Sequence, residues 1–156
     1  MCSMPMHVII FGCGRTGAEL ARTLTQRGHR VTVIERDPLM LERLGEDHKC
    51  RTIVGNGLDE DVLRSAGIET ADAFVSTTRG DNTNLMAAQI AQLKYKVPRV
   101  CVKVNDPVRA KEYRKLGLFC ITPNLLTAGL MLSWLLDEPF LTADAYNNVD
   151  VEEGGL

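Results

Sequence analysis

The sequence predicts a Rossmann-like α/β fold, a doubly wound parallel sheet of six strands with helices on both faces. Short apolar runs alternate with helix-like segments along nearly the whole chain, which indicates βαβ units. A glycine-rich loop follows the first apolar run, as in dinucleotide-binding folds. The length of 156 residues fits one domain with a sizeable core and leaves no room for a second large one.

The first half of the chain supplies three of the predicted strands. Its first apolar run stops at Gly12, and the helix after the glycine-rich loop ends at Gly28, a residue type suited to a helix C-terminus. Asp37 and Pro38 form an N-cap and a first-turn proline for the next helix, and Gly67 closes the third. The expected strands are 6–11, 31–35 and 52–54, and the expected helices are 14–27, 38–44 and 59–66.

The second half repeats the alternation. Leu85, Ala88 and Ala91 recur at helical spacing and form the inner stripe of one helix, while Asp106 and Pro107 cap another. The expected strands are 73–76, 100–104 and 119–122, and the expected helices are 81–95, 107–116 and 124–136. We therefore expect a domain over residues 1–140, followed by an acidic, flexible tail over 141–156.

Composition excludes several classes of protein. The formal net charge of −2 lacks the positive excess of a nucleic-acid binder. The most apolar stretch, 125–136, is shorter than the roughly 20 residues that span a bilayer, so we expect no membrane insertion. Five cysteines without a CxxC pair or a histidine at ligand spacing indicate reduced thiols and no metal site. We expect a soluble, intracellular protein.

The loop Gly12-Cys13-Gly14-Arg15-Thr16-Gly17 matches GxGxxG between a predicted strand and a predicted helix. The glycines permit a tight turn, a close backbone approach to phosphate, and close packing of the helix on the strand. A pyrophosphate then lies at the positive end of the helix dipole. The alternative is a glycine turn without a ligand, and the strand–loop–helix context favours the nucleotide site.

Glu35 ends the second predicted strand, close to the position of the ribose-binding acid in such sites. A carboxylate there accepts hydrogen bonds from ribose hydroxyls and repels a 2′-phosphate, which favours NAD or an adenosine nucleotide over NADP. The next residue, Arg36, leaves an alternative open, because an arginine after this strand can hold a 2′-phosphate or lie in solvent.

Two cations are further candidates for phosphate contact. Arg15 follows the second glycine and either reaches over the phosphates or remains an exposed first-turn residue. Lys103 is the one charged residue in the apolar strand 100–104, so its ammonium must reach solvent or meet an anion. The carboxyl end of a parallel strand is where doubly wound sheets bind ligands, which favours the anion.

The run VIIFGCGRTGAELARTLTQRGHRVTVIERDP resembles the nucleotide-binding RCK or TrkA-N domain of bacterial potassium-transport regulators. The VGNG, STTRGDNTNLMAAQIA and VKVND segments match as well, so the resemblance covers about residues 6–138. It implies that the glycine loop and Glu35 hold the adenosine half of NAD(H), ATP, ADP or AMP, and that Asn56 contacts the base. It also implies that the rest of the site is lined by Thr77, Thr78, Arg79 and Lys103.

The resemblance further implies a cytoplasmic regulator that lies peripheral to the inner face of the membrane and serves a potassium channel or transporter. Regulators of this family usually continue into a smaller C-terminal ligand-binding domain, which 156 residues cannot contain. Related domains pair through the helix that corresponds to 124–136 and assemble into rings. The residues themselves point to pairing as well, because this helix is apolar on nearly every face and no chain is expected after Pro139 to cover it.

Two other function classes compete with a nucleotide sensor. An NAD-dependent oxidoreductase fragment would need a substrate domain and a positioned acid or base, and neither Tyr95 nor Tyr113 has a lysine four residues later. An interaction module without a nucleotide would not need the intact glycines or Glu35. We therefore expect a regulatory domain that is not an enzyme.

Overall fold

The computed structural model describes residues 4–148. Six strands form a sheet in the order β3-β2-β1-β4-β5-β6, and the pairs β1–β2, β1–β4, β2–β3 and β4–β5 are parallel. The strand order reverses between β1 and β4, so the predicted doubly wound α/β fold is confirmed. The chain divides into two compact units between Val102 and Lys103. The predicted single domain over 1–140 stays a prediction.

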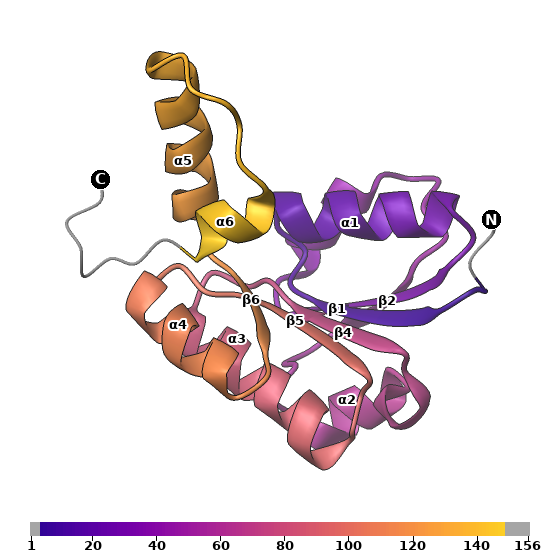
Figure 1. The fold of residues 1–156 in the computed structure, drawn as a ribbon. Coiled ribbons are helices and arrows are strands. Elements are labelled where there is room, and N and C mark those ends of the chain that lie inside the picture. The colour runs from indigo at the N-terminus through magenta and orange to yellow at the C-terminus, as the bar shows by residue number, and fades with distance from the viewer. Residues whose placement is uncertain (1–3, 149–156) are drawn as a thin grey trace. The chain divides into compact units, whose positions relative to one another are not determined.

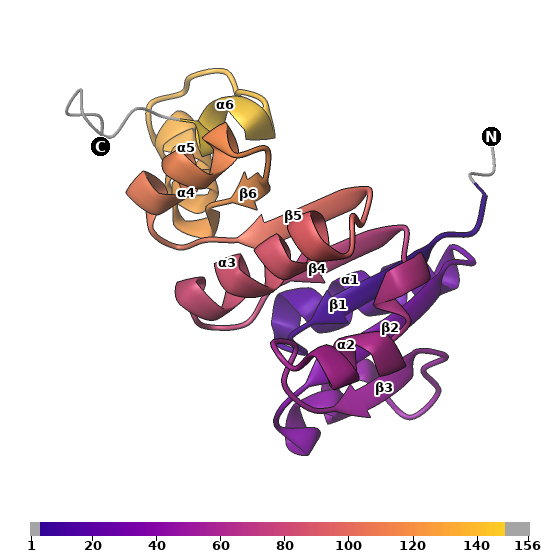
Figure 2. The ribbon, with the colours of Figure 1, turned by 90° about the horizontal axis from the view of Figure 1, so that it is seen from below.

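The first unit holds most of the sheet. Figure 1 shows α1 on one side of its strands and α2 and α3 on the other, and Figure 2 shows the same layers from below. Its strands are β1 (His7–Phe11), β2 (Arg30–Glu35), β3 (Arg51–Val54), β4 (Ala73–Ser76) and β5 (Arg99–Lys103). Its helices are α1 (Arg15–Gln26), α2 (Glu60–Ser65) and α3 (Asp81–Gln89), with 3-10 helices η1 (Pro38–Leu44) and η2 (Ile68–Thr70) and π-helix η3 (Ile90–Lys94).

The core of this unit lies on both faces of the sheet. Val8 and Ile10 pack in the cluster under α1, whereas Ile9 and Phe11 pack in the cluster under α2 and α3. All four side chains are at most 2% exposed. A strand buried on both faces must be apolar at successive positions, which explains why β1 shows no alternation in the sequence.

Two predicted helices differ from the observed ones in type. The segment 38–44 is a 3-10 helix that begins where Asp37 Oδ1 accepts a hydrogen bond from Leu39 N (3.0 Å) and ends at Gly45, with φ +85°. The expected helix 81–95 is α-helical only to Gln89 and continues as η3, where Tyr95 N donates to Ile90 O (3.3 Å). The predicted inner stripe of this helix is confirmed as buried.

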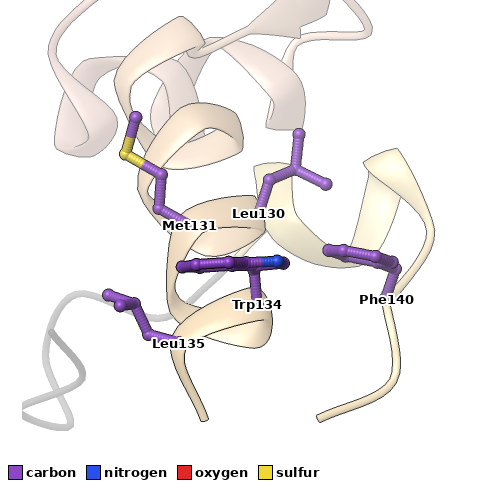
Figure 3. Close-up of a pocket in the computed structure, with 5 residues that line it drawn as sticks. All are labelled: Leu130, Met131, Trp134, Leu135 and Phe140. Carbon is purple, nitrogen blue, oxygen red and sulfur yellow. The ribbon is translucent and has the colours of Figure 1, made fainter. Parts of the chain in front are cut away.

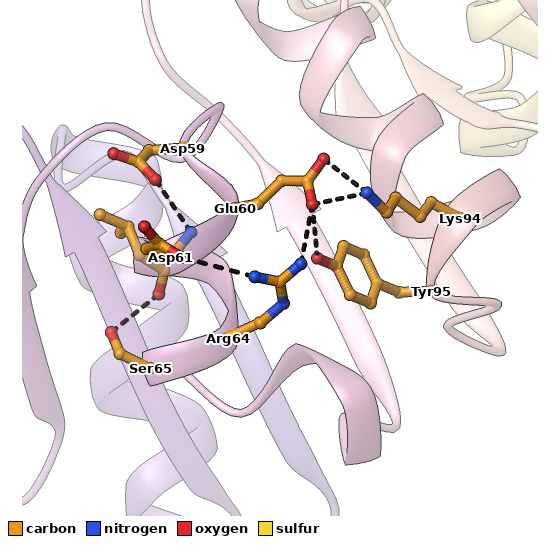
Figure 4. Close-up of polar contacts among 8 residues, drawn as sticks. Asp59, Glu60, Asp61, Arg64, Ser65, Lys94 and Tyr95 are labelled. Atoms are coloured by element: carbon orange, nitrogen blue, oxygen red, sulfur yellow. Dashed lines mark hydrogen bonds and ion pairs between the residues drawn. The ribbon is translucent and has the colours of Figure 1, made fainter.

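Polar contacts join η3 to α2 on the surface of the first unit (Figure 4). Lys94 Nζ lies 2.6 Å from Glu60 Oε1, and the hydroxyl of Tyr95 lies 3.3 Å from Glu60 Oε2. Arg64, one turn along α2, also pairs with Glu60 at 3.1 Å. The hydrogen bond from Lys94 is the largest of the influences that lower the pKa of the Glu60 carboxyl. These contacts join the π-helical turn at the end of α3 to α2.

The second unit contains the last four regular elements. They are α4 (Pro107–Lys115), β6 (Phe119–Ile121), α5 (Pro123–Leu135) and α6 (Ala143–Asn147). Backbone bonding places Val104 next to β6, since Val104 N donates to Ile121 O at 2.9 Å. Arg114 on α4 donates to Cys120 O at 3.1 Å, which ties α4 to the same strand.

The segment after Pro139 differs from the expected flexible tail, because α6 packs against α5. The Tyr146 hydroxyl bonds Ser133 Oγ (2.8 Å) and accepts from Leu141 N (2.9 Å). A Cβ on Gly129 would lie 2.3 Å from the Tyr146 ring, so only glycine fits there. The chain beyond Pro139 therefore covers one side of α5, contrary to the expectation, while residues 149–156 lie outside those the structure describes.

The rest of α5 exposes a set of large apolar side chains, which we call the α5 apolar face. Trp134 is 73% exposed, Leu135 69% and Met131 61%. Figure 3 shows them with Leu130 and with Phe140 from the loop after the helix. The predicted surplus of apolar residues on this helix is thus present even though α6 covers the Gly129 and Ser133 side.

Candidate functional site

The glycine turn after β1 has two positions that tolerate no side chain. Gly12 has φ +109°, and a Cβ there would lie 2.9 Å from Thr77 C and 3.0 Å from Thr78 N. A Cβ on Gly17 would lie 2.0 Å from Gly12 O. Packing within the protein thus accounts for both glycines: the first lets β1 turn beside β4, and the last lets α1 lie close to that turn.

Gly14 is different, because nothing in the described protein requires a glycine there. Its φ of −72° and ψ of −170° suit any residue, and a Cβ would meet no atom within 4 Å. Gly14 is also the N-cap of α1, with no side-chain cap and no acidic residue in the first turn. The first amide N–H groups of this helix of 12 residues therefore have no side-chain cap, and the backbone of Gly14 beside them is bare. That arrangement suits an approaching phosphate.

Glu35 lies directly beside this turn. Its Oε2 accepts a hydrogen bond from Cys13 N at 2.7 Å, while Oε1 accepts from Arg36 N at 2.8 Å and from Asp37 N at 3.0 Å. The side chain is half-buried, so a ligand over the glycine turn can still reach it. Arg36 is exposed.

Cys13 contributes its backbone to the site and keeps its thiol in the core. The side chain is fully buried, and this burial, followed by the nearby Glu35 carboxylate, raises the pKa of the thiol to about 11. The thiol is therefore neutral at physiological pH and a poor nucleophile.

The turn after β3 approaches the same edge of the sheet. Gly55 N donates to Glu35 O at 2.9 Å, so the residue before Asn56 is bonded to the last residue of β2. Asn56 is half-buried, and its Oδ1 accepts from Leu58 N at 3.1 Å, as in an Asx turn. A Cβ on Gly57 would lie 2.5 Å from the Phe11 ring, so glycine is required there as well.

The loop after β4 forms the other wall of the turn. Thr77 N donates to Phe11 O at 2.8 Å, and the Thr77 side chain is buried, with Cγ2 near Gly17. Thr77 therefore packs against the glycine turn, whereas Thr78 is half-buried and Arg79 is exposed. Sequence reasoning missed one residue here, the fully buried Asn84, which bonds this loop. Its signal was a polar residue at helical spacing with Ala88 and Ala91.

The first unit thus brings together the glycine turn, Glu35, Asn56 and the loop after β4. Arg15 and Thr16 are exposed on the first turn of α1 and border an open depression with Glu19. Lys103 is half-buried at the end of β5 and is the first residue of the second unit. Within residues 4–148, no group of three His, Cys, Asp or Glu side chains is placed to hold a metal ion. No helix in that range is long and apolar enough to cross a membrane.

Known proteins share sequence and fold with this chain. The family model of the TrkA-N domain matches residues 8–122. The Trk system potassium uptake protein TrkA of Streptomyces coelicolor is 45% identical over 131 residues, which cover 84% of this chain and 59% of that protein. A TrkA homolog of Methanothermobacter thermautotrophicus is 33% identical, over 81% of this chain and 58% of its own length. The chain therefore spans about three-fifths of these relatives.

Solved structures share the fold. The TrkA-N domain of the Escherichia coli inner membrane protein ybaL has a TM-score of 0.74 at 20% identity, covering 85% of this chain and 98% of that one. The AMP-bound Kef C-terminal domain of Shewanella denitrificans has a TM-score of 0.70 at 20% identity, over 95% and 92%. The GsuK channel bound to NAD has a TM-score of 0.68 at 21% identity, over 84% and 24%. The family match and the sequence relatives together show that this chain belongs to the TrkA-N domain family.

Proposed function

We propose that this chain is a regulatory nucleotide-binding domain of a potassium channel or transporter, and that it binds NAD(H) or an adenine nucleotide such as ATP, ADP or AMP. The observation that carries the proposal is Gly14, a position where the protein's own packing does not require a glycine. It is the N-cap of α1, which has no side-chain cap, and it follows Cys13, whose N–H bonds Glu35. Close approach of a phosphate is a sufficient reason for glycine there.

The site residues then divide the ligand between them. The backbone of residues 12–17 holds phosphate, Glu35 accepts from the ribose, and Asn56 lies beside the base. The exposed cations Arg15 and Arg79 reach toward phosphate, and Lys103 remains a further proposed contact. Two structural relatives were solved with AMP and NAD, which supports this ligand class for the fold.

We propose binding without catalysis, with an NAD-dependent oxidoreductase as the alternative. The relatives that match are named potassium uptake proteins, which favours a regulator. The proposed location is the cytoplasmic side of the membrane, where the domain would contact its transporter. The check is the absorbance of NADH mixed with the protein and candidate oxidants. A regulator leaves the NADH absorbance constant, whereas a sustained decrease would establish the oxidoreductase.

The Glu35 contact can be tested with a pair of ligands that differ by one hydroxyl. Titration calorimetry with ADP and 2′-deoxy-ADP should show that the wild-type protein prefers ADP by about tenfold, the scale of one hydrogen bond to a charged group. In Glu35→Ala this preference should be lost, so that ADP and 2′-deoxy-ADP bind with about the same affinity, even if both bind more weakly than to the wild type. NADH should also bind more tightly than NADPH.

Either of two results would contradict this assignment. If Glu35→Ala keeps the full preference for ADP, the ribose lies elsewhere. If NADPH binds more tightly than NADH, Arg36 rather than Glu35 decides specificity. A wild-type protein that binds none of these nucleotides would refute the proposed function itself.

We also propose that the domain forms a homodimer through the α5 apolar face and can extend to a ring. Apolar patches of this kind usually mark partner sites. Nucleotide binding that favours one arrangement of the pair would bias an attached pore, because differential affinity for two states shifts their populations.

Trp134→Asp should convert a dimer to a monomer in light scattering at micromolar concentration. Leu39→Asp is the matched control, because Leu39 is 69% exposed on η1 in the first unit and lies outside the proposed interface. Nucleotide affinity should stay within about twofold in both variants. A wild-type protein that is already monomeric would refute the pairing.

A further inference from the structure

Asn84 is a fully buried polar residue in the first turns of α3, and its side chain turns back to the loop after β4. Its Oδ1 accepts hydrogen bonds from Thr78 N at 2.8 Å, from Thr78 Oγ1 at 2.6 Å and from Ser76 Oγ at 3.1 Å. Its Nδ2 donates to Thr78 O at 3.0 Å. One carboxamide therefore holds both the backbone N–H and the backbone carbonyl of Thr78.

The segment that Asn84 holds lies against the glycine turn. A Cβ on Gly12 would lie 2.9 Å from the carbonyl carbon and oxygen of Thr77 and 3.0 Å from Thr78 N. The backbone of this loop is thus in contact with the residue that begins the candidate phosphate turn. If Thr78 moves, Gly12 loses the surface on which it packs.

Neither helix propensity nor apolar packing explains an asparagine at this position. Its neighbours on the inner face of α3, Leu85 and Ala88, are apolar and buried. Asparagine is a weaker helix former than alanine, and burying an amide is unfavourable unless its hydrogen bonds are made. A small apolar residue would suit the helix and the core better, so the bonds to the loop are the reason for asparagine here.

We infer that Asn84 is a positioning residue for nucleotide binding: it does not touch the ligand, and it fixes the loop after β4 in the conformation that closes the site. This inference rests on the proposed nucleotide-binding function. It follows that loss of the carboxamide lets the loop leave this conformation. The apparent association constant then equals the intrinsic one multiplied by the fraction of molecules in which the loop is in place.

The test uses the whole chain with ADP as the probe. Asn84→Ala should raise the Kd for ADP about tenfold, the scale of a lost hydrogen bond in a buried network. Ser76→Ala, which removes one donor to Asn84, should raise it about threefold. The double variant should bind no more weakly than Asn84→Ala alone, because both changes act through the same carboxamide.

The control separates positioning from general loss of stability. Thr32→Val also removes a buried side-chain hydrogen bond, the one between Thr32 Oγ1 and His7 Nε2 at 3.1 Å, from β2 in the same unit. It should lower the urea midpoint as the Asn84 variant does, yet leave the Kd for ADP within about twofold.

Two results would overturn the inference. The first is an Asn84→Ala protein that binds ADP like the wild type, which would make Asn84 a structural residue only. The second applies if Asn84→Ala does not fold: an unchanged Kd in Ser76→Ala then has the same meaning. If the wild-type protein itself binds neither ADP nor NADH, the proposed function is refuted and this inference falls with it.

Discussion

Replacing Gly14 with alanine should separate nucleotide binding from folding. The new Cβ meets no protein atom within 4 Å, and the φ of −72° is accessible to alanine. A less flexible unfolded chain stabilises the variant by about 0.4–1 kcal/mol, and replacing glycine at an N-cap costs a similar amount. The two effects nearly cancel, so the free energy of unfolding should change by less than about 1 kcal/mol.

Affinity should respond much more strongly. The methyl group of Gly14→Ala occupies the space through which a phosphate reaches the first N–H groups of α1, and the Kd for ADP should rise at least about tenfold. Urea unfolding and titration calorimetry on the same preparation measure both quantities.

Gly17→Ala is the matched control, because its Cβ would lie 2.0 Å from Gly12 O. It should therefore destabilise the protein by about 3 kcal/mol or more. A Gly14→Ala protein that binds ADP with wild-type affinity would show that no ligand approaches this backbone, and the phosphate assignment would be wrong.

Two further predictions concern stability. The pKa of Glu60 is lowered, chiefly by the hydrogen bond from Lys94, so its contribution is present above the ordinary carboxyl value of 4.5 and disappears as the pH falls through the folded-state value. Between about pH 7 and pH 3, urea unfolding should therefore show a smaller loss of stability in Lys94→Met than in the wild type. An unchanged loss would mean that other carboxylates cause the acid destabilisation. Tyr146→Phe removes the hydroxyl that bonds Ser133 Oγ and should lower the free energy of unfolding by about 1–3 kcal/mol. Tyr113→Phe is the control, because the hydroxyl of Tyr113 bonds no described residue, and it should lower the free energy of unfolding much less. Equal losses in the two variants would contradict a stabilising role of the Tyr146 hydroxyl.

The elements that the sequence predicted well are those with strong local signals. Strands buried on both faces read as apolar runs, and the Asp106 side chain caps α4 as expected, accepting from Val108 N at 2.9 Å. The doubly wound parallel sheet followed from the glycine loop together with the alternation of strands and helices. The two helices of unexpected type, η1 and η3, were harder, because 3-10, α and π turns share almost the same residue preferences.

The candidate site could be predicted in outline only. GxGxxG and Glu35 have a fixed spacing along the chain, so their proposed roles rest on a local sequence motif. The contribution of Asn84 depends on contacts with a loop six residues earlier in the chain, and no motif encodes that. The packing of α6 was missed because Tyr146 and Asn147 lie in a polar, acidic segment, and only the fit of the Tyr146 ring over Gly129 reveals that they are buried.

The three amide N–H groups that hold the Glu35 carboxylate also affect how a ligand would be recognised. Ordering a free glutamate side chain costs up to about 1.5–2 kcal/mol of rotamer entropy. Here the bonds from Cys13, Arg36 and Asp37 order it when the chain folds. A ribose bound as proposed would therefore meet an acceptor that is already immobile, and its hydroxyls would not have to contribute this ordering. The turns after β1 and β2 would thus preorganise the proposed recognition at this position, and its specificity would depend on those turns as much as on the carboxylate.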